Sequence, residues 1–507
     1  METENKRIAK NTLMLYFRQI LILLTSLYTV RIVLQALGAE DYGIYNVVAG
    51  TVTMFGFLTN SLAGASQRFF SFELGQGNSE SLQKIFSLML VIYILLAITV
   101  LLFAETLGLW FVKNKLTIPP TRINAAVWVY QASILSFIIS ILTAPYMAAI
   151  IAHENMKIYA YASVIEAILK FLVALSLNFM PEKLIAYGLL LLIITFLNTA
   201  VYRFYCGKHY KECRFVFSWD KEKFKEIISY SSWNLFGASI SIIKNQIMNI
   251  LLNIFFNPVV NAARSISVQV NNAVNSFAGN FTTAMRPQII KQYAAGKHDK
   301  VAQLVFYGCK YTFFLMFIFS LPLILEMNYI LKLWLSHPPQ MAVVFTRLAL
   351  IDAVIASMSY QLMTWAQATG KIKLYQSVVG IILILNLPIS YVALKLGCPA
   401  YSVMIIAIVL SLVATIARLL ILKRLTSFSL IKFFTSSLLP ILAVTLTSSV
   451  IPCFLHYIME ENFFRLCIVL VSAILLTLFS IFTIGLSHGE RKVIFINIKN
   501  RLFTKNK

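Results

Sequence analysis

Long apolar segments recur along the whole chain and are separated by short polar loops. A helix that crosses a bilayer needs about 20 apolar residues, and about fourteen segments approach that length. The pattern therefore predicts an all-α polytopic membrane protein. The predicted spans are 13–34, 44–65, 85–103, 123–151, 158–179, 184–205, 227–255, 262–284, 304–325, 343–368, 374–394, 400–422, 433–454 and 463–486.

The second predicted span, 44–65, carries polar and small residues along one side. At 100° per residue, Asn46, Gly50, Asn60 and Gly64 fall on one helical face, opposite valine, leucine and phenylalanine side chains. Close packing between helices explains the two glycines but not the two asparagines together. We therefore expect this face to line a protein groove or a wet cavity.

The strongest polar stripes follow the adjacent spans 227–255 and 262–284 at helical spacing. The first stripe comprises Asn234, Ser241, Asn245, Asn249 and Asn253, with Lys244 beside them, and the second comprises Arg264, Ser267, Asn271 and Asn275. A single buried asparagine often joins two helices by a hydrogen bond. Two such stripes on neighbouring helices favour a hydrated cavity.

Arg18 is a charged residue inside the first span, on the face that Thr25 and Thr29 share. It lies about 9 Å from the start of the span at 1.5 Å per residue. A charge at this depth usually faces a cavity. Snorkelling to the headgroups is an equally good interpretation. Arg31 points elsewhere, near the other end of the span, and is better explained as an interfacial anchor.

Three further charged residues lie within predicted spans. Glu166 and Lys170 are four residues apart, which favours mutual neutralisation on one helix face. Asp352 is compatible with a proton or cation site and equally with a hydrogen bond between helices.

The composition agrees with a membrane protein, because 59% of the 507 residues are hydrophobic and only 12% are charged. Soluble domains carry about 25% charged residues. A net charge of +23 would suit nucleic acid. However, the basic residues cluster in short loops between apolar spans. We therefore expect contact with the lipid bilayer and no nucleic-acid partner.

Lysine and arginine are concentrated in alternate loops, which indicates the orientation of the chain. Basic loops stay on the cytoplasmic side, so we expect both termini and the loop 206–226 to be cytoplasmic.

This longest loop divides the chain. The segment 57–86 weakly resembles 277–306, six spans later, which predicts parallel repeats. The expected parts are an N-lobe at 1–215, a C-lobe at 216–425, and two extra spans with a basic tail at 426–507.

The sequence gives no case for an enzyme. It lacks the phosphate-binding GxxxxGK[ST] motif and the HExxH and GxSxG motifs. Cys206, His209 and Cys213 share one loop, but their spacing fits no standard zinc motif. No cofactor and no metal site are therefore predicted.

Two motifs resemble those of a known family. RIVLQALGAEDYGIYNVVAG, followed by a helix ending in QRFF, is similar to the start of Wzx-type polysaccharide flippases. FNPVVNAARSISVQVNNAVNSFAGNFTTAMRPQIIKQYAAG resembles the matching signature in the second half. These flippases belong to the multidrug/oligosaccharidyl-lipid/polysaccharide exporter superfamily. The motifs cover about residues 8–310, and the span pattern covers the rest.

The resemblance implies two six-helix lobes with a central cavity, and two extra helices at the C-terminus. It implies translocation of undecaprenyl-diphosphate-linked oligosaccharide across the bacterial cytoplasmic membrane for surface polysaccharide synthesis. Related lipid II flippases use cavity arginines on the first and eighth helices, and Arg18 and Arg264 are the matching candidates. The expected substrate-binding residues are Arg18, Asn46, Asn60, Lys244, Asn245, Asn249, Arg264, Asn271 and Asn275.

Several points stay open at the level of sequence. The same superfamily contains cation-coupled multidrug exporters, which often use acidic sites in the N-lobe, and no clear acidic residue lies on the expected cavity faces of the first two spans. A membrane enzyme of polysaccharide assembly is the third alternative. We expect a monomer that works beside a polysaccharide polymerase and glycosyltransferases. Coupling to a proton gradient, a sodium gradient or the membrane potential is not decided.

Overall fold

The computed structural model describes residues 2–116, 118–256, 258–335, 337–426 and 428–491. Within these ranges every regular element is a helix. All fourteen predicted spans fall on helical segments, as the spacing of the apolar residues predicts. The end of the predicted basic tail, 492–507, lies outside the described residues.

In the described part of the chain, 12 helices are long and apolar enough to cross a membrane. A bent pair, Glu40–Val52 with Gly56–Gln76, forms a thirteenth candidate span. The prediction of an all-α polytopic membrane protein is therefore confirmed. The eighth predicted span falls on α9 (Pro258–Ala294), which is a continuous helix but is not among the twelve. Its asparagine, serine and arginine side chains make α9 less apolar than the twelve helices.

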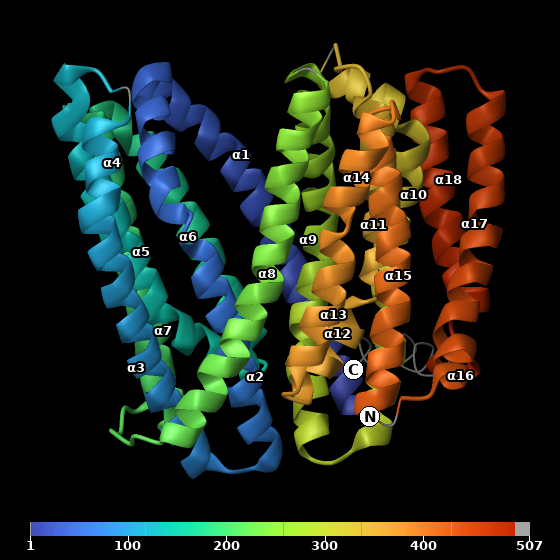
Figure 1. Cartoon of the computed structure of the whole chain (residues 1–507), viewed down its shortest axis with the longest axis horizontal. Coiled ribbons are helices and arrows are strands. Elements are labelled where there is room, and N and C mark those ends of the chain that lie inside the picture. The colour runs from blue at the N-terminus through green and yellow to red at the C-terminus, as the bar shows by residue number, and fades with distance from the viewer. Residues whose placement is uncertain (1, 117, 257, 336, 427, 492–507) are drawn as a thin grey trace, which may run out of the picture. The chain divides into compact units, whose positions relative to one another are not determined.

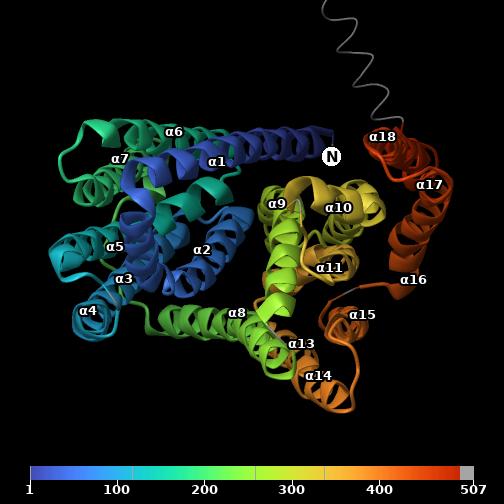
Figure 2. The same ribbon diagram turned by 90° about the horizontal axis from the view of Figure 1, so that it is seen from above.

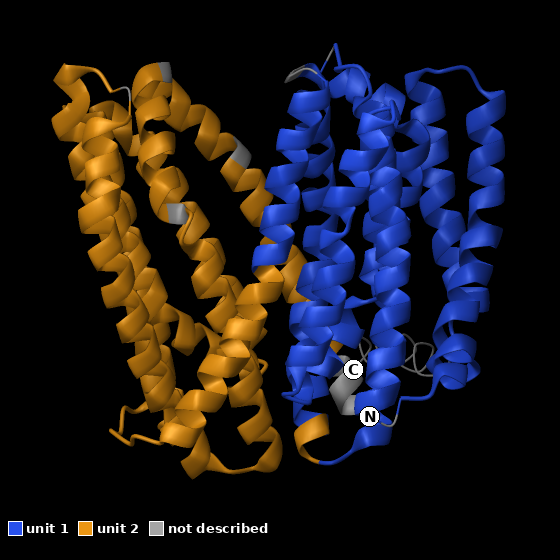
Figure 3. Cartoon of the chain, in the orientation of Figure 1, with its two compact units in different colours: residues 1–7, 239–292, 296–507 blue, residues 8–238, 293–295 orange. Residues whose placement is uncertain are grey.

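The chain forms two compact units, which Figure 3 distinguishes by colour. Unit 2 contains residues 8–238 and 293–295, and unit 1 contains residues 1–7, 239–292 and 296–507. The division between them falls within α8 (Lys221–Phe255). The lobe boundary between residues 215 and 216 stays a prediction. The separate segment 426–507 stays a prediction as well.

Helix α1 (Glu2–Thr53) is labelled in Figure 1, and most of it belongs to unit 2. The other helices of this unit are α2 (Gly56–Gln76), α3 (Ser79–Phe103), α4 (Leu109–Asn114), α5 (Ile123–Ala152), α6 (Met156–Ser176) and α7 (Lys183–His209). Helix α5 packs against α2, α3 and α7. A buried core gathers around Val48, Val129 and Tyr130.

Unit 1 begins with the second half of α8 and continues through α9. The remaining helices are α10 (His298–Leu335), α11 (Ala342–Ser357), α12 (Tyr360–Ala368), α13 (Ile372–Ile384), α14 (Asn386–Lys395), α15 (Ser402–Leu425), α16 (Leu430–Phe433), α17 (Leu439–Ile458) and α18 (Phe463–Ser480). Helix α10 packs against α11, α17 and α18 (Figure 2). Its core includes Phe313, Phe345 and Leu350.

Two backbone features interrupt the region of the first two predicted spans, one between the spans and one within the second span, 44–65. Gly38 interrupts α1 with φ 78° and ψ 170°, a conformation that is essentially restricted to glycine. The chain bends again by 48° between Val52 and Gly56. The loop that the sequence predicted between spans 13–34 and 44–65 is therefore a sharp kink within a longer helix.

A buried ion cluster fixes the last two helices to α10. Glu326 is fully buried and accepts hydrogen bonds from Arg465 of α18 at 3.0 and 3.2 Å. His456 of α17 lies 2.7 Å from the other carboxylate oxygen of Glu326. A buried carboxylate needs such partners because its desolvation is costly. This cluster therefore fixes where α17 and α18 dock on unit 1.

Candidate functional site

The polar stripes of α8 and α9 meet inside unit 1. One terminal nitrogen of Arg264 donates to the Asn249 side-chain oxygen and, at 3.3 Å, to the Asn245 carbonyl. The other terminal nitrogen donates to Asn245 Oδ1 at 3.2 Å. We call Asn245, Asn249 and Arg264 the arginine–amide cluster. Sequence periodicity predicted the two faces, and the structure brings them together.

The guanidinium of Arg264 is buried, and its hydrogen-bond partners in the described part of the chain are neutral. Only 6% of the residue is exposed. Among the described residues, no carboxylate forms an ion pair with Arg264, and its Nε has no hydrogen-bond partner. Neutral amide oxygens solvate the positive charge without cancelling it. The arginine–amide cluster therefore keeps a positive charge that an anion such as phosphate would neutralise, with the guanidinium geometry suited to bidentate contact.

Lys244 adds a second positive charge near the arginine–amide cluster. It interacts electrostatically with Arg264, which repels it, and with Asp352 of α11, which attracts it. One oxygen of Asp352 is buried without a hydrogen-bond partner among the described residues. Arg264, Lys244 and Asp352 together therefore carry two formal positive charges and one negative charge.

Further along α9, a second set of polar side chains is joined by hydrogen bonds. Asn275 donates to Asn271 at 2.7 Å, and the hydroxyl of Tyr360 in α12 donates to Asn275 at 2.8 Å. We call these three residues the amide–tyrosine chain. Asn271 lies seven residues beyond Arg264, which is about 10 Å along the helix and on the same face. The two polar groups therefore follow one side of α9.

Arg18 has a different environment, within unit 2. Its guanidinium lies 4.5 Å from the centre of the Tyr159 ring of α6, which is a cation–π contact. Its Nε is buried and has no hydrogen-bond partner among the described residues. Thr25 and Thr29, on the predicted polar face, donate to carbonyls of their own helix at 2.8 and 2.7 Å. The phosphate-binding role of Arg18 stays a prediction.

The two asparagines of the predicted second span are exposed. Asn46 donates to the carbonyl of Tyr42, four residues earlier, at 2.9 Å. Such a bond stays within one helix and joins no second element. The structure thus places Asn46 and Asn60 on the surface of unit 2.

The predicted pair of Glu166 and Lys170 is confirmed, with 2.6 Å between the carboxylate and the ammonium group. Asn198 of α7 also donates to Glu166 at 2.7 Å. The two residues therefore neutralise each other on one helix face, as the sequence predicted.

Comparison with known proteins addresses the family. The model of the family described as polysaccharide biosynthesis protein matches residues 8–292, more than half of the chain. The chain belongs to the polysaccharide biosynthesis protein family. The MatE family model also matches, over residues 235–392. No curated protein matches the chain in sequence.

Solved structures with the same fold are transporters. One is a multidrug resistance MATE family transporter of the MOP superfamily in an outward-facing conformation, with TM-score 0.72 and 13% identity. The match covers 82% of this chain and 94% of that chain. A second is the MATE transporter ClbM in complex with Rb⁺, with TM-score 0.68, 15% identity, and coverage of 84% and 96%. This polysaccharide biosynthesis protein is therefore a member of the multidrug/oligosaccharidyl-lipid/polysaccharide exporter superfamily.

Sequence reasoning missed part of this family member's polar interior. Arg418, which lies inside the predicted span 400–422 but was not singled out, lies in α15 and donates to Tyr375 and Ser359, each at 3.1 Å. Tyr360 was also missed. The partner of Tyr360, Asn275, lies on a helix distant in sequence, so helical periodicity could not predict this contact. Ser359, which contacts Arg418, and Tyr360 both lie where the helix is interrupted between α11 and α12.

Proposed function

We propose that this protein translocates undecaprenyl-diphosphate-linked oligosaccharide repeat units across the cytoplasmic membrane by alternating access, for surface polysaccharide synthesis. The observation that carries the proposal is a buried arginine whose hydrogen-bond partners among the described residues are the neutral Asn245 and Asn249, in a membrane protein of the polysaccharide biosynthesis family. A diphosphate needs cations, and its sugars need amide and hydroxyl partners. Unit 1 offers both kinds of group along one side of α9.

Each part of the substrate then has a binding role assigned to it. Arg264 and Lys244 would contact the diphosphate, and the asparagines of the arginine–amide cluster would release Arg264 as phosphate oxygens replace their own. Asn271, Asn275 and Tyr360 would bind sugar hydroxyls. Arg18 would supply a phosphate contact from the other unit, as one side of a two-lobed transporter. The exposed Asn46 and Asn60 would contact sugars during passage.

A cation-coupled multidrug exporter is the second candidate. The MatE match over residues 235–392 and the transporter structures favour it. Asp352, with one buried and unbonded oxygen, is a possible site for a proton or a monovalent cation in that mechanism. The same carboxylate would serve coupling to a proton or sodium gradient in a flippase. A membrane enzyme of polysaccharide assembly is third, and would require activity in purified protein without translocation.

The cell biology follows from the proposed function. The protein would reside in the bacterial inner membrane with both termini cytoplasmic, and would act as a monomer beside a polysaccharide polymerase and glycosyltransferases. Cysteine labelling tests the orientation. A cysteine at position 215 should react with an impermeant reagent only after the membrane is opened, and labelling of intact cells would contradict the orientation.

Deletion and complementation test the function. A deletion strain should lose surface polysaccharide and accumulate lipid-linked repeat units inside, and the wild-type gene should restore both. Normal surface polysaccharide together with raised sensitivity to cationic dyes would instead establish the exporter. Arg264→Ala at normal membrane levels should fail to complement.

A further inference from the structure

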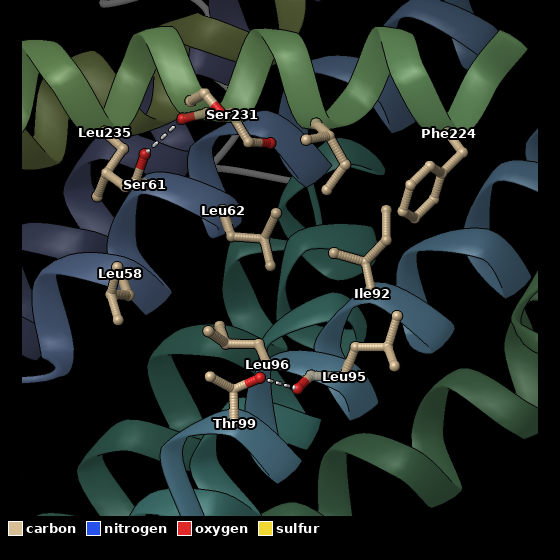
Figure 4. Close-up of a pocket in the computed structure, with 12 residues that line it drawn as sticks. Leu58, Ser61, Leu62, Ile92, Leu95, Leu96, Thr99, Phe224, Ser231 and Leu235 are labelled. Atoms are coloured by element: carbon tan, nitrogen blue, oxygen red, sulfur yellow. Dashed lines mark hydrogen bonds between the residues drawn. The ribbon is translucent and has the colours of Figure 1, made fainter. Parts of the chain in front are cut away.

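A crevice in unit 2 is separate from the polar groups of unit 1. It has a volume of about 270 Å³ and lies among α2, α3 and the first half of α8 (Figure 4). Leu62, Ile92 and Leu96 are among the apolar residues that line it, and Ser61, Ser231 and Thr99 are the hydroxyl-bearing residues on α2, α8 and α3. Such a volume is slightly below the range of about 300–1,000 Å³ that is typical of small-ligand sites. Its apolar lining suits a hydrocarbon chain.

The segment before α8 indicates where this crevice lies in the bilayer. Phe215, Phe217 and Trp219 are 54%, 76% and 52% exposed. Exposed aromatic residues next to basic ones are typical of a membrane–water interface. Trp219 also packs on Phe224, a residue that lines the crevice, with 4.9 Å between ring centres.

Hydrogen bonds fix that segment against α3. Gln83 donates to the Arg214 carbonyl at 3.1 Å, and the Val216 amide donates to Ser87 at 3.0 Å. From Lys221, the first residue of α8, Leu235 lies about 21 Å along the helix at 1.5 Å per residue. The crevice therefore begins at the predicted cytoplasmic headgroup level and extends into the hydrocarbon core.

Basic side chains lie on the same face of α8 as the crevice. Lys221, Lys225, Ile228, Ser232 and Leu235 recur at spacings of three and four, so they form one stripe. The last three line the crevice, and both lysines are exposed. An anionic headgroup above the crevice would meet these two charges.

The acidic residues nearby are largely engaged. Asp220 accepts from the Lys223 amide at 3.0 Å, and Glu226 pairs with Lys223 and with Arg68. The exposed Glu222 is the remaining acid in the first turn of α8. Cations therefore exceed free carboxylates at the mouth of the crevice.

We propose that this crevice binds the polyprenyl tail of the lipid-linked substrate when the substrate first loads, with its diphosphate beside Lys221 and Lys225 before Arg264 and Lys244 contact it. The inference rests on the proposed function for the identity of the lipid. The Ser231 hydroxyl is buried without a hydrogen-bond partner among the described residues. An isoprenoid chain offers π electrons at every double bond, which accept weak hydrogen bonds, whereas a saturated acyl chain offers none.

A photoreactive polyprenyl diphosphate with a diazirine in its tail tests the site. The purified full chain is placed in nanodiscs of phosphatidylethanolamine and phosphatidylglycerol, irradiated, and mapped by mass spectrometry. Crosslinks should concentrate on α2, α3 and α8 around Leu95 and Ser232. Unlabelled undecaprenyl diphosphate should compete with the probe and lower crosslinking, and added phosphatidylglycerol should leave crosslinking unchanged.

Two tryptophan substitutions provide the matched comparison. Ser232→Trp fills the crevice from an exposed position and should lower crosslinking about tenfold, which corresponds to about 1.4 kcal/mol. Leu102→Trp is the control, because Leu102 is 61% exposed on α3 and does not line the crevice. It should leave crosslinking unchanged.

Three outcomes would overturn the inference: crosslinks spread evenly over lipid-facing helices, equal competition by phosphatidylglycerol, or equal crosslinking in both tryptophan variants. Binding in nanodiscs requires no transport, so these results are independent of complementation. If the wild-type gene fails to restore polysaccharide while the crosslinks map to the crevice, the proposed function fails and the lipid site stands.

Discussion

The polar residues of α8 and α9 differ from those of α1 and α2 in what they contact. Arg264 is buried and receives hydrogen-bond partners from a second helix, Asn245 and Asn249. Asn46 is exposed and binds the backbone of its own helix. Both regions showed polar stripes in the sequence. The comparison teaches that a stripe becomes a preformed site only where a facing helix supplies complementary groups.

The largest effect is expected from Arg264. Replacement by alanine removes the charge and leaves Asn245 and Asn249 without their donor, so we expect transport to fall at least a hundredfold, or about 2.7 kcal/mol. Transport of a lipid-linked substrate into sealed vesicles measures this, with membrane levels checked by blot. Wild-type transport by Arg264→Ala would remove the arginine–amide cluster from the mechanism.

A smaller loss is expected when one amide of that cluster is removed. Asn249→Leu deletes a hydrogen bond to a charged group, which is worth about 1.5–3 kcal/mol. Both transport, by roughly tenfold, and resistance to thermal unfolding should therefore fall. Combining Asn249→Leu with Arg264→Ala should give less than the sum of the separate losses. Additive losses would show that the two residues act independently.

Replacement by lysine distinguishes the role of Arg18 from the role of Arg264. Lysine retains a cation–π contact, so Arg18→Lys should keep transport within about threefold of wild type by preserving the contact with Tyr159. Lysine lacks the planar fork, so Arg264→Lys should lose more. The vesicle assay ranks the two variants. The reverse ranking would contradict the assigned environments.

The exposed asparagines should affect transport without affecting stability. Asn46→Ala and Asn60→Ala replace surface groups, and such changes usually alter stability by less than about 0.5 kcal/mol. Transport should fall a few-fold if they contact passing sugars. Thermal unfolding in detergent measures the first quantity and the vesicle assay the second. A large loss of stability in either variant would show that the asparagine has a structural role.

The smallest effect on transport is expected from a carboxylate contact in unit 1. Burial raises the pKa of Glu490, but hydrogen bonds from Tyr311, Ser487 and Lys310 lower it below its ordinary value in net. A lowered pKa stabilises the fold above the unfolded value, and that stabilisation is lost as pH falls through the folded value.

Glu490→Gln should therefore lower the thermal midpoint at pH 7, and its difference from wild type should shrink below about pH 4.5, the ordinary value. The arginine–amide cluster contains no carboxylate, so Arg264→Ala should show no matching change with pH. Calorimetry across this pH range checks both. A constant difference for Glu490→Gln would contradict the lowered pKa.

The sequence by itself determined the membrane class, the helical segments and the two polar faces of α8 and α9. Length and hydropathy decide spans because a bilayer requires about 20 apolar residues and internally satisfied backbone groups. Periodicity of 3.6 residues decides which side chains share a face, which is why Asn245, Asn249, Arg264, Asn271 and Asn275 were found.

Tertiary structure alone decided which faces meet. It placed Tyr360 on Asn275 and Asp352 near Lys244, and it made the loop at Gly38 a kink within α1. It also placed the ring of Tyr159 beside Arg18, and it formed the crevice of unit 2 between the consecutive helices α2 and α3 and the distant α8. Contacts between distant helices depend on crossing geometry and side-chain packing, and helical periodicity carries no information about either.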